Sequence, residues 1–389
     1  MTTKRHLLAG AALLSAALLA GPASAQEPLK IGLILPMTGP FASTGRQVEA
    51  AVKLYQQQNG DTVAGRKVQV ILKDDTGTAD VTKRLAQELI VNDKVTAIAG
   101  FGLTPLALAA APLATQAKVP ELVMCAATSS ITEASPFVVR SGFTLPQVAT
   151  PMADWAAKNG IKKVVTLVTD FGPGIDAEKS FSEAFTKVGG TVENLRVPLR
   201  NPDFSPFLQR AADAKPDAVF IFVPSGAGAQ FMKQFSERGL DKSGIKLIGT
   251  GDVTDDDLLN DMGDVALGAV TSFHYSAAHD SPENKAYVDG FRKANGGMRP
   301  NFHSVGGYDG MHLLYEGLKK TNGQGGQALV DAMKGMSWKS PRGPVTLDAA
   351  TRDMVQNVYI RKVEKKDGEL YNVEFATLES VKDPAKAAK

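Results

Sequence analysis

The sequence LKIGLILPMTGPFASTGRQVEAAVKLYQQQ spans residues 29–58 and contains the three parts of one α/β unit. Residues 29–35 are almost continuously apolar, which is typical of a parallel strand that is buried on both faces. From Ala42 to Gln58 the apolar residues recur at helical spacing, which predicts an amphipathic helix. A polar loop that contains glycine joins the two elements. This stretch therefore predicts that the chain begins with a doubly wound α/β unit.

The same alternation continues along the next seventy or so residues. Short apolar runs predict three more strands, and two helical patterns separate them. The predicted strands are residues 68–72, 95–99 and 121–125, and the predicted helices are residues 79–92 and 105–117. These elements complete one doubly wound unit.

The pattern restarts after the region of Pro146 and Pro151, which we interpret as the passage to a second unit. The predicted strands of this unit are residues 164–169, 192–198, 218–223 and 246–249, and its predicted helices are residues 176–188, 206–214 and 227–238. The two units share an architecture but no repeat of individual residues. The fold class is therefore predicted to be α/β, with two doubly wound lobes.

The elements that follow are too few for a third domain. They are a strand at 267–275, helices at 282–294, 305–320 and 327–334, and a β-hairpin of residues 357–363 and 369–375. We expect them to complete the first two units, so that the chain crosses between the lobes three times in a three-segment hinge. The predicted lobes are residues 26–142 with 277–350, and residues 143–276 with 351–389.

The N-terminus has the pattern of a secretory signal peptide. Lys4 and Arg5 precede an uncharged stretch, and the small residues 23–25 follow it. We predict that residues 1–25 are cleaved off before Gln26 and that the mature chain is periplasmic. A membrane anchor needs about 18 to 20 apolar residues and no cleavage site, so we expect no direct membrane insertion.

Charge and cysteine content exclude further classes of protein. Without Lys4 and Arg5 the chain carries 41 basic and 41 acidic residues, which gives no electrostatic argument for binding nucleic acid. The single cysteine, Cys125, follows three apolar residues and is predicted to be buried and structural. An intrachain disulfide is excluded, so hydrophobic cores must hold the fold.

No motif for nucleotide binding or covalent catalysis is present. Gly39 and Gly45 follow the first strand but do not form G-x-G-x-x-G, and neither a Walker A sequence nor G-x-S-x-G occurs. His274, His279 and His303 lack the spacing of a metal site, and we expect them at the surface or at the edge of a pocket. Residues 255–257, three aspartates, are expected in a solvated turn. We therefore predict no enzyme, no metal site and no cofactor.

Loops at the carboxyl ends of predicted strands form the candidate site, because ligands bind at this edge of open α/β sheets. Thr104 is predicted to cap a helix that has Pro105 in its first turn, which leaves free N–H groups facing the crevice. Residues 126–130 follow the fourth strand and add hydroxyl groups. Together these loops would bind a carboxylate. Residues 170–174 and 249–252 lie at the corresponding edge of the second lobe, so a small ligand is predicted between the lobes.

Seven short motifs, in matching order and spacing, resemble the leucine/isoleucine/valine-binding family of type I periplasmic binding proteins. They are LILPMTGP at 33–40, KDD at 73–75, AG at 99–100, KVP at 118–120, ATS at 127–129, DFGPG at 170–174 and YDG at 308–310. Members of this family are extracytoplasmic receptors of ABC importers. The resemblance covers the whole mature chain and implies the type I periplasmic binding fold.

The resemblance also implies which residues contact the ligand. The family holds the ligand's carboxylate with a hydroxyl after the third strand and with the loop after the fourth, and these positions match Thr104, Ala126 and Thr128. Phe171 occupies the position of an aromatic residue that covers the ligand, where binders of branched-chain amino acids usually have tyrosine. Thr44 would also line the pocket.

Three further positions are implied by the same resemblance. Either Phe302 or His303 would line the pocket. The acidic residue that usually binds the ligand's ammonium group falls on Gly251, with Asp252 one place later. If Asp252 does not turn inward, the ammonium group of an amino acid would be buried without a partner, which is strongly unfavourable. The predicted ligand is therefore a carboxylate, either an amino acid of the branched-chain type or a related organic acid.

The predicted function is that of a periplasmic substrate-binding protein. It would close on its ligand by a hinge motion and deliver the ligand to the permease subunits of an ABC transporter. A ligand-sensing receptor domain for a signalling partner is the alternative, because the fold alone does not separate sensing from transport. We expect a monomer.

Overall fold

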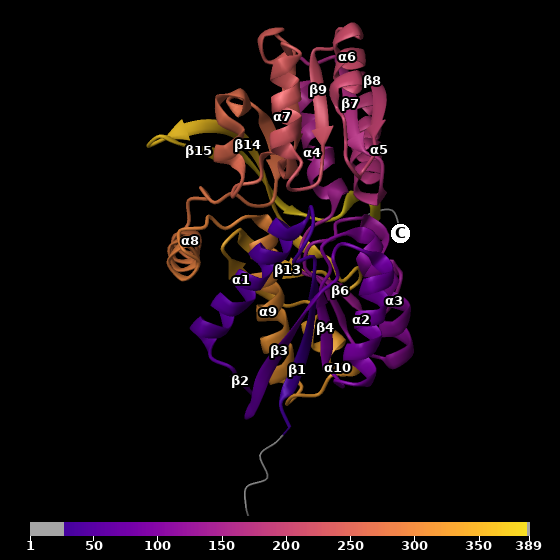
Figure 1. Ribbon diagram of the computed structural model, residues 1–389, viewed down its shortest axis with the longest axis vertical. Coiled ribbons are helices and arrows are strands. Elements are labelled where there is room, and N and C mark those ends of the chain that lie inside the picture. The colour runs from indigo at the N-terminus through magenta and orange to yellow at the C-terminus, as the bar shows by residue number, and fades with distance from the viewer. Residues whose placement is uncertain (1–26, 387–389) are drawn as a thin grey trace, which may run out of the picture.

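Two α/β lobes lie one above the other in the computed structural model, which describes residues 27–386 (Figure 1). Each lobe is built around its own sheet. The predicted signal peptide, residues 1–25, lies outside the described residues. Among the described helices, none has the length and apolar character needed to cross a membrane.

The first sheet has six strands in the order β2-β3-β1-β4-β5-β6. These are β1 (Leu29–Leu35), β2 (Thr62–Val63), β3 (Arg66–Asp74), β4 (Ala97–Gly100), β5 (Glu121–Val123) and β6 (Val138–Arg140). All neighbours pair in parallel except β2 and β3. The helices of this lobe are α1 (Ala42–Asn59), α2 (Ala79–Val91), α3 (Thr104–Ala117), α9 (Phe302–Lys320) and α10 (Gly326–Met333), and α8 (Pro282–Ala294) contacts α1.

The second sheet has nine strands in the order β12-β13-β14-β11-β10-β9-β7-β8, and β15 pairs with β14. These are β7 (Lys163–Thr169), β8 (Thr191–Val197), β9 (Ala218–Phe222), β10 (Lys246–Thr250), β11 (Val270–Phe273), β12 (Ser337–Ser340), β13 (Gly343–Leu347), β14 (Met354–Lys366) and β15 (Glu369–Val381). Strands β7 to β11 are parallel, and the others are antiparallel. The helices are α4 (Leu145–Lys158), α5 (Gly172–Lys187), α6 (Ser205–Asp213) and α7 (Gly228–Glu237).

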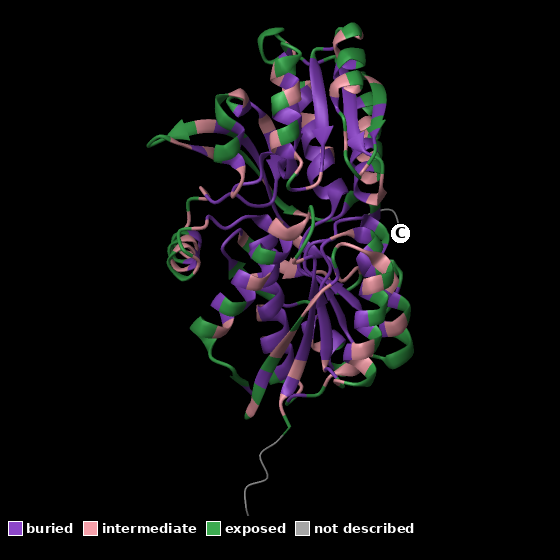
Figure 2. Ribbon diagram, in the orientation of Figure 1, coloured by how far each residue is buried: buried purple, intermediate pink, exposed green. Residues whose placement is uncertain are grey.

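The central strands of both sheets are buried, while the exposed residues gather on the outer faces of the helices (Figure 2). Helices cover both faces of a parallel sheet, so its strands contribute apolar side chains to two core layers. The predicted α/β class with two doubly wound lobes is confirmed.

The chain passes between the two sheets three times, as predicted. It leaves the first sheet after β6, returns to that lobe after β11 and leaves it again after α10. The exact lobe boundaries stay predictions. Residues 337–347, which we assigned to the first lobe, form β12 and β13 and join the second sheet through β14.

Helix α4 occupies the region that we interpreted as a passage between units. Pro146 lies in the first turn of α4. An N–H group in this turn would have no partner within the helix, so a proline here removes no helical hydrogen bond. The side chain of Gln147 reaches back and accepts a hydrogen bond from the N–H group of Thr144 at 2.9 Å, which fixes the start of the helix. Pro151 lies inside the helix, yet α4 persists because it buries an apolar face that includes Met152.

Candidate ligand-binding cavity

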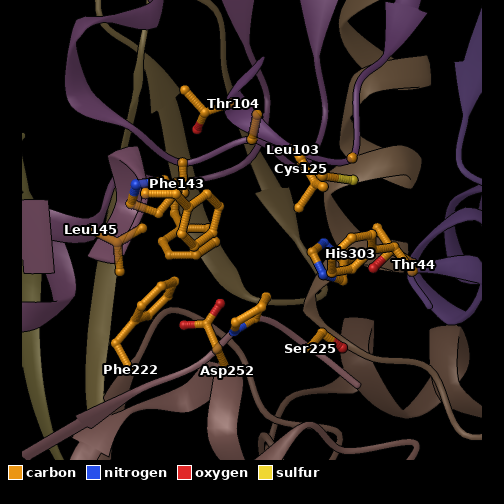
Figure 3. A pocket seen from close by; sticks show the side chains of 17 residues that line it. Thr44, Leu103, Thr104, Cys125, Phe143, Leu145, Phe222, Ser225, Asp252 and His303 are labelled. Carbon is orange, nitrogen blue, oxygen red and sulfur yellow. The ribbon is translucent and has the colours of Figure 1, made fainter. Parts of the chain in front are cut away.

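A cavity lies between the two lobes, at the carboxyl ends of the parallel strands (Figure 3). Its polar side chains are Thr44, Thr104, Ser225, Asp252 and His303. The rest of its lining is Phe41, Gly102, Leu103, Cys125, Ala126, Ala127, Phe143, Leu145, Phe171, Pro173, Phe222 and Pro224. The cavity is therefore mostly apolar, with a few hydrogen-bonding groups, as is usual for sites that bind small molecules.

The eight predicted ligand-binding residues converge on this region. Six line the cavity, namely Thr44, Thr104, Ala126, Phe171, Asp252 and His303. Thr128 lies behind Thr104, with 2.8 Å between the two hydroxyl oxygens. Phe302 does not line the cavity but packs against Phe143, which does, with ring centroids 5.8 Å apart. That these residues bind a ligand stays a prediction.

The N-terminus of α3 forms one end of the cavity. The preceding loop turns at Gly100, where φ is 111° and a Cβ atom would lie 2.3 Å from the carbonyl oxygen of Ile34, so only glycine fits. Helix α3 begins at Thr104 and Leu103 is its N-cap residue, so the prediction that Thr104 caps the helix is wrong. The Thr104 hydroxyl pairs with Thr128 instead. In the first turn of α3 Pro105 has no N–H group, and the N–H group of Leu106 donates to the carbonyl oxygen of Leu103 at 3.0 Å, which leaves the N–H group of Thr104 for this end of the cavity.

Arg140 fixes the loop after β5. Its guanidinium group donates hydrogen bonds to the carbonyl oxygens of Thr128, at 2.6 Å, and of Phe143, at 3.0 Å. Its Nε atom lies 3.2 Å from Oδ1 of Asp353. The Arg140 side chain is fully buried and does not reach the cavity. It therefore sets the position of the Thr128 loop and of the Phe143 ring without contacting a ligand.

Cys125 and Ala126 contribute neighbouring parts of the wall. The N–H group of Ala126 donates to the carbonyl oxygen of Phe101 at 3.1 Å, so it is not available to a ligand. The Cys125 side chain is 3% exposed, which confirms the prediction that it is buried. Burial raises the pKa of its thiol well above the ordinary value, so the group is a thiol and not a thiolate at neutral pH.

Asp252 lies at the end of the cavity opposite Thr104 (Figure 3). Its carboxylate turns inward and accepts a hydrogen bond from the Thr250 hydroxyl at 2.8 Å. Burial raises the pKa of Asp252 to about 7, although the Thr250 hydrogen bond and the charge of Arg361 oppose the rise. At neutral pH the group therefore exists both as a carboxylate that accepts and as a carboxylic acid that donates.

His303 lies in the first turn of α9 and adds a second hydrogen-bonding group. Burial lowers the pKa of its imidazole to about 3, so the ring is neutral at neutral pH. Among the described residues its Nδ1 atom has no hydrogen-bond partner. A neutral imidazole carries one donor and one acceptor, and either can serve a hydroxyl group of a ligand.

Aromatic rings form much of the cavity wall. Phe171 stacks on Phe222 with ring centroids 6.0 Å apart and an interplanar angle of 29°. Phe143 is supported from behind by the His274 ring, with centroids 4.5 Å apart and an angle of 24°. Such surfaces suit a planar apolar ring. Within the described chain, the lining of this cavity includes no lysine and no arginine.

Two predictions about polar residues are wrong. His274, expected at the surface or at a pocket edge, is fully buried because it lies behind Phe143 where the chain returns to the first lobe. Asp255 and Asp256, expected in a solvated turn, are 1% and 3% exposed. The turn after β10 is covered by the start of α9, and Asn301 donates a hydrogen bond to Asp255.

Several lining residues were not singled out from the sequence. Phe143 and Leu145 lie at the first crossing between lobes, and Phe222 ends a buried strand, so their apolar character indicated only a core. Ser225 could have been found, because it follows the carboxyl end of β9 in the turn Pro224-Ser225-Gly226. The rule that ligands bind at this edge applies to that loop as well.

Sequence comparison finds relatives of this chain among known proteins. The family described as Periplasmic binding protein matches residues 28–369. A curated relative, the Leu/Ile/Val-binding protein homolog 6 of Brucella abortus (strain 2308), is 45% identical over 378 residues. That match covers 95% of this chain and 97% of the relative.

Two solved structures of ABC transporter solute-binding proteins are similar to the whole described fold. The protein of Rhodopseudomonas palustris BisB5, in complex with 3,4-dihydroxybenzoic acid, is 64% identical with a TM-score of 0.91, over 93% of this chain and 99% of that one. The protein of Rhodopseudomonas palustris HaA2, in complex with p-hydroxybenzoic acid, is 41% identical with a TM-score of 0.90, over 93% of this chain and 100% of that one.

Proposed function

The chain belongs to the periplasmic binding protein family, and from this we propose that it binds a hydroxylated benzoate for an ABC importer. Like the relatives described above, it is a substrate-binding protein and not an enzyme. We take 3,4-dihydroxybenzoate as the first candidate ligand because the protein with 64% identity was solved with that compound.

The observation that carries the proposal is the placement of polar groups at two separated ends of an aromatic cavity. At one end, the hydroxyl group of Thr104 and its N–H group at the start of α3 offer neutral donors to a carboxylate. At the other end, Asp252 offers an acceptor to a ring hydroxyl, and His303 adds a further hydrogen-bonding group. The rings of Phe143 and Phe171 line the space between. A benzoate with a para hydroxyl group has the same sequence of polar, apolar and polar parts.

A branched-chain amino acid is the second candidate, and the inward carboxylate of Asp252 favours it. That carboxylate could pair with an ammonium group and would then stay ionised. However, an α-amino acid carries its ammonium and carboxylate groups on the same carbon atom, whereas Asp252 and Thr104 lie at opposite ends of the cavity. The geometry therefore supports the hydroxybenzoate better.

Calorimetric titration of the wild type and of Asp252→Asn tests the proposal. The ligands are 3,4-dihydroxybenzoate, 4-hydroxybenzoate, benzoate, leucine and valine. We expect the wild type to bind the hydroxylated benzoates most tightly, and the variant to bind them more weakly by about 1 kcal/mol, because its amide oxygen still accepts a hydrogen bond but carries no charge. Benzoate is the internal control, and its affinity should not change. Tight binding of leucine by the wild type, lost in the variant, would refute the proposal.

The proposed location is the periplasm, with a mature chain that begins at Gln26 and carries no lipid. The sequence supports it through the small residues 23–25 and through the distance of Cys125 from the cleavage site. Intact mass and N-terminal sequencing of the native protein test this. An uncleaved or acylated N-terminus would contradict it. We also propose that the mature protein is a monomer, which light scattering after gel filtration checks.

A further inference from the structure

Asn301 is the N-cap residue of α9, and one end of its side-chain amide belongs to that helix. Its Oδ1 atom accepts hydrogen bonds from the N–H groups of His303, at 2.9 Å, and of Ser304, at 3.2 Å. The side chain thereby satisfies two of the N–H groups that have no partner within the helix. Because His303 lines the ligand cavity, Asn301 fixes the turn that carries it.

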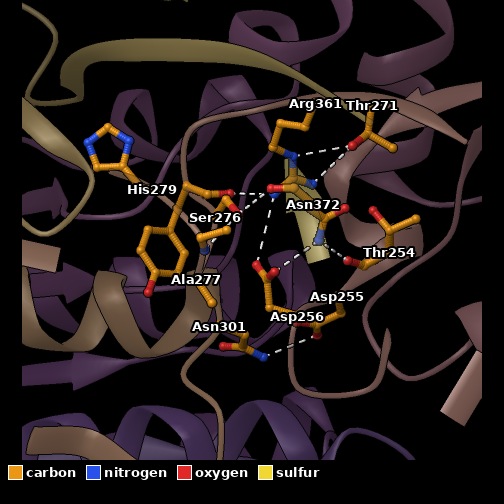
Figure 4. A network of polar contacts seen from close by, with 12 residues as sticks. Thr254, Asp255, Asp256, Thr271, Ser276, Ala277, His279, Asn301, Arg361 and Asn372 are labelled. Atoms are coloured by element: carbon orange, nitrogen blue, oxygen red, sulfur yellow. Dashed lines mark hydrogen bonds and ion pairs between the residues drawn. The ribbon is translucent and has the colours of Figure 1, made fainter. Parts of the chain in front are cut away.

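The other end of the same amide reaches the second lobe. Its Nδ2 atom donates to Oδ2 of Asp255 at 3.1 Å and to Oδ1 of Asp257 at 3.0 Å. Figure 4 shows Asn301 reaching toward the turn that contains Asp255 and Asp256. This turn follows the 3₁₀ segment at the end of β10, in the second sheet. The amide therefore bridges the lobes with both of its hydrogen atoms.

Both aspartates are connected to the cavity by further hydrogen bonds. The hydroxyl of Ser225, a cavity residue of the second lobe, donates to Oδ2 of Asp255. Oδ2 of Asp257 accepts from the Ser43 hydroxyl at 2.8 Å and from Nε2 of Gln47 at 3.1 Å. Ser43 and Gln47 belong to α1, whose residue Thr44 lines the cavity. One polar network thus joins cavity residues of both lobes.

We propose that Asn301 is a positioning residue that holds the lobes in the closed arrangement and so slows the release of the ligand. The inference rests on the proposed ligand site between the lobes, but on no particular ligand. Asparagine fits this position because it accepts at one end and donates at the other, and all four of its hydrogen-bonding positions are used. A carboxylate here would cap the helix equally well but would face two other carboxylates.

The burial of the acidic partners explains why the bridge matters. Asp255 is fully buried, and burial together with the neighbouring Asp257 carboxylate raises its pKa well above the ordinary value. Buried carboxyl groups are costly unless they are hydrogen-bonded. The loss of Nδ2 would leave Oδ2 of Asp255 with the Ser225 hydroxyl as its donor, and would remove the amide donor from Oδ1 of Asp257. In an open arrangement water would replace the amide. The closed arrangement should therefore be the one that loses stability when the bridge is removed.

Two single variants separate bridging from helix capping. Asn301→Ser keeps an efficient N-cap but is too short to bridge the lobes, and Asn301→Asp keeps the cap while adding a like charge. We expect ligand dissociation, followed by stopped flow, to be faster by about tenfold in Asn301→Ser and by more in Asn301→Asp, since tenfold corresponds to about one hydrogen bond to a charged group. Ser281→Ala is the matched control, because Ser281 caps α8 through Asn284 and makes no bridge to the second lobe.

A double variant tests the pairing itself. Asn301→Asp with Asp257→Asn again places one amide opposite one carboxylate, so dissociation should be slower than in Asn301→Asp alone. If Asn301 only stabilised the fold, the second substitution would not slow dissociation again. Melting temperatures measured in parallel show whether a variant has lost stability. Wild-type dissociation rates in both single variants, or no rescue in the double variant, would overturn the proposal.

The probe is whichever of the five titrated compounds the wild type binds most tightly. If that compound is leucine or valine, the hydroxybenzoate proposal fails, while the comparison of dissociation rates still decides the role of Asn301. If it is 3,4-dihydroxybenzoate and the variants release it at the wild-type rate, the bridge proposal fails alone.

Discussion

The hydroxyl oxygens of Thr104 and Thr128 lie 2.8 Å apart, so that one of the two hydroxyl groups donates to the other. Thr104 lines the cavity, whereas Thr128 does not, and the carbonyl oxygen of Thr128 accepts a hydrogen bond from Arg140. If Thr128 donates, the Thr104 hydrogen is free for the ligand. A donor that itself accepts a hydrogen bond is a stronger donor. The pair therefore offers a carboxylate one polarised hydroxyl group instead of two independent ones.

Replacing Thr104 by alanine should weaken binding of any carboxylate ligand by about 1.5 to 3 kcal/mol, the usual loss for a hydrogen bond to a charged group. Thr128→Val removes only the second hydroxyl and should cost about 0.5 to 1.5 kcal/mol. Thr104→Ser is the matched control, because it keeps the hydroxyl. Calorimetry measures all three affinities. Unchanged binding in Thr104→Ala would show that the carboxylate binds elsewhere.

Replacing Gly172 by alanine should hinder closure of the lobes. Gly172 begins α5 in the second lobe, and a Cβ atom there would lie 2.6 Å from Oγ1 of Thr128 and 3.3 Å from Cγ2 of Thr104. The methyl group would therefore press against the first lobe only when the cleft is closed. We expect weaker ligand binding and a larger radius of gyration at ligand saturation, with little change in melting temperature.

The control for this variant is Gly290→Ala. Gly290 also lies in a helix, and the atom closest to the added methyl group would be the mobile end of Gln58, at 3.1 Å. This change should leave both the affinity and the scattering curve as in the wild type. Equal compaction of Gly172→Ala and wild type on adding ligand would contradict the predicted clash.

Asp252→Asn should change how stability depends on pH. The pKa of Asp252 rises from the ordinary 3.8 to about 7 in the folded protein, so between these values the folded state binds more protons than the unfolded state. This group therefore lowers the stability progressively as the pH rises from about 4 to about 7, and its effect is constant above that.

The variant lacks this titration, so its stability relative to the wild type should increase with pH over the same window. Urea unfolding of both proteins without ligand, at pH 5, 6, 7 and 8, measures the difference. Taking the difference removes contributions of other titrating groups, such as His303. A difference that does not vary between pH 5 and 7 would show that Asp252 is ionised throughout.

The rate at which Cys125 is chemically modified should depend on whether the cleft between the lobes is open or closed. It is the single cysteine, it lines the cavity, and burial keeps its thiol protonated, so modification by a maleimide should be slow in the folded protein. Opening of the lobes exposes the cavity, and saturation with ligand should slow the reaction further. Mass spectrometry over time measures the rate. A rate that is equal with and without bound ligand would contradict the assignment of this cavity as the ligand site.

Most of the fold was predictable because its signals are local. The strand at residues 29–35 and the helix that begins at Ala42 lie as predicted, since a buried apolar run and a helical period are each visible within one short window. Helix α4 was missed because Pro146 and Pro151 resemble a boundary, and only its tertiary packing shows otherwise. The short strands β12 and β13 contain polar residues, and only their pairing with β14 defines them.

The site was predictable only in part, for a similar reason. Thr104 and Asp252 follow strands at the edge where ligands bind, and the family resemblance pointed to both. Phe143 and Asn301 carry no such signal, because their roles depend on partners far away in sequence. Asn301 and Asp255 form a hydrogen bond although they are 46 positions apart in the sequence. Contacts of this kind follow from how the lobes are placed and not from any local pattern.

The absence of lysine and arginine from the cavity lining, within the described residues, has a consequence for the environment in which the protein works. Ionic strength weakens attraction between full charges, whereas hydrogen bonds inside a closed cavity are screened far less. An anion held by hydroxyl groups and by the N–H group at the start of α3 should therefore bind with nearly the same affinity in dilute and in saline surroundings. The fraction of receptor that is loaded would then follow the supply of the aromatic acid and not the salinity outside the cell.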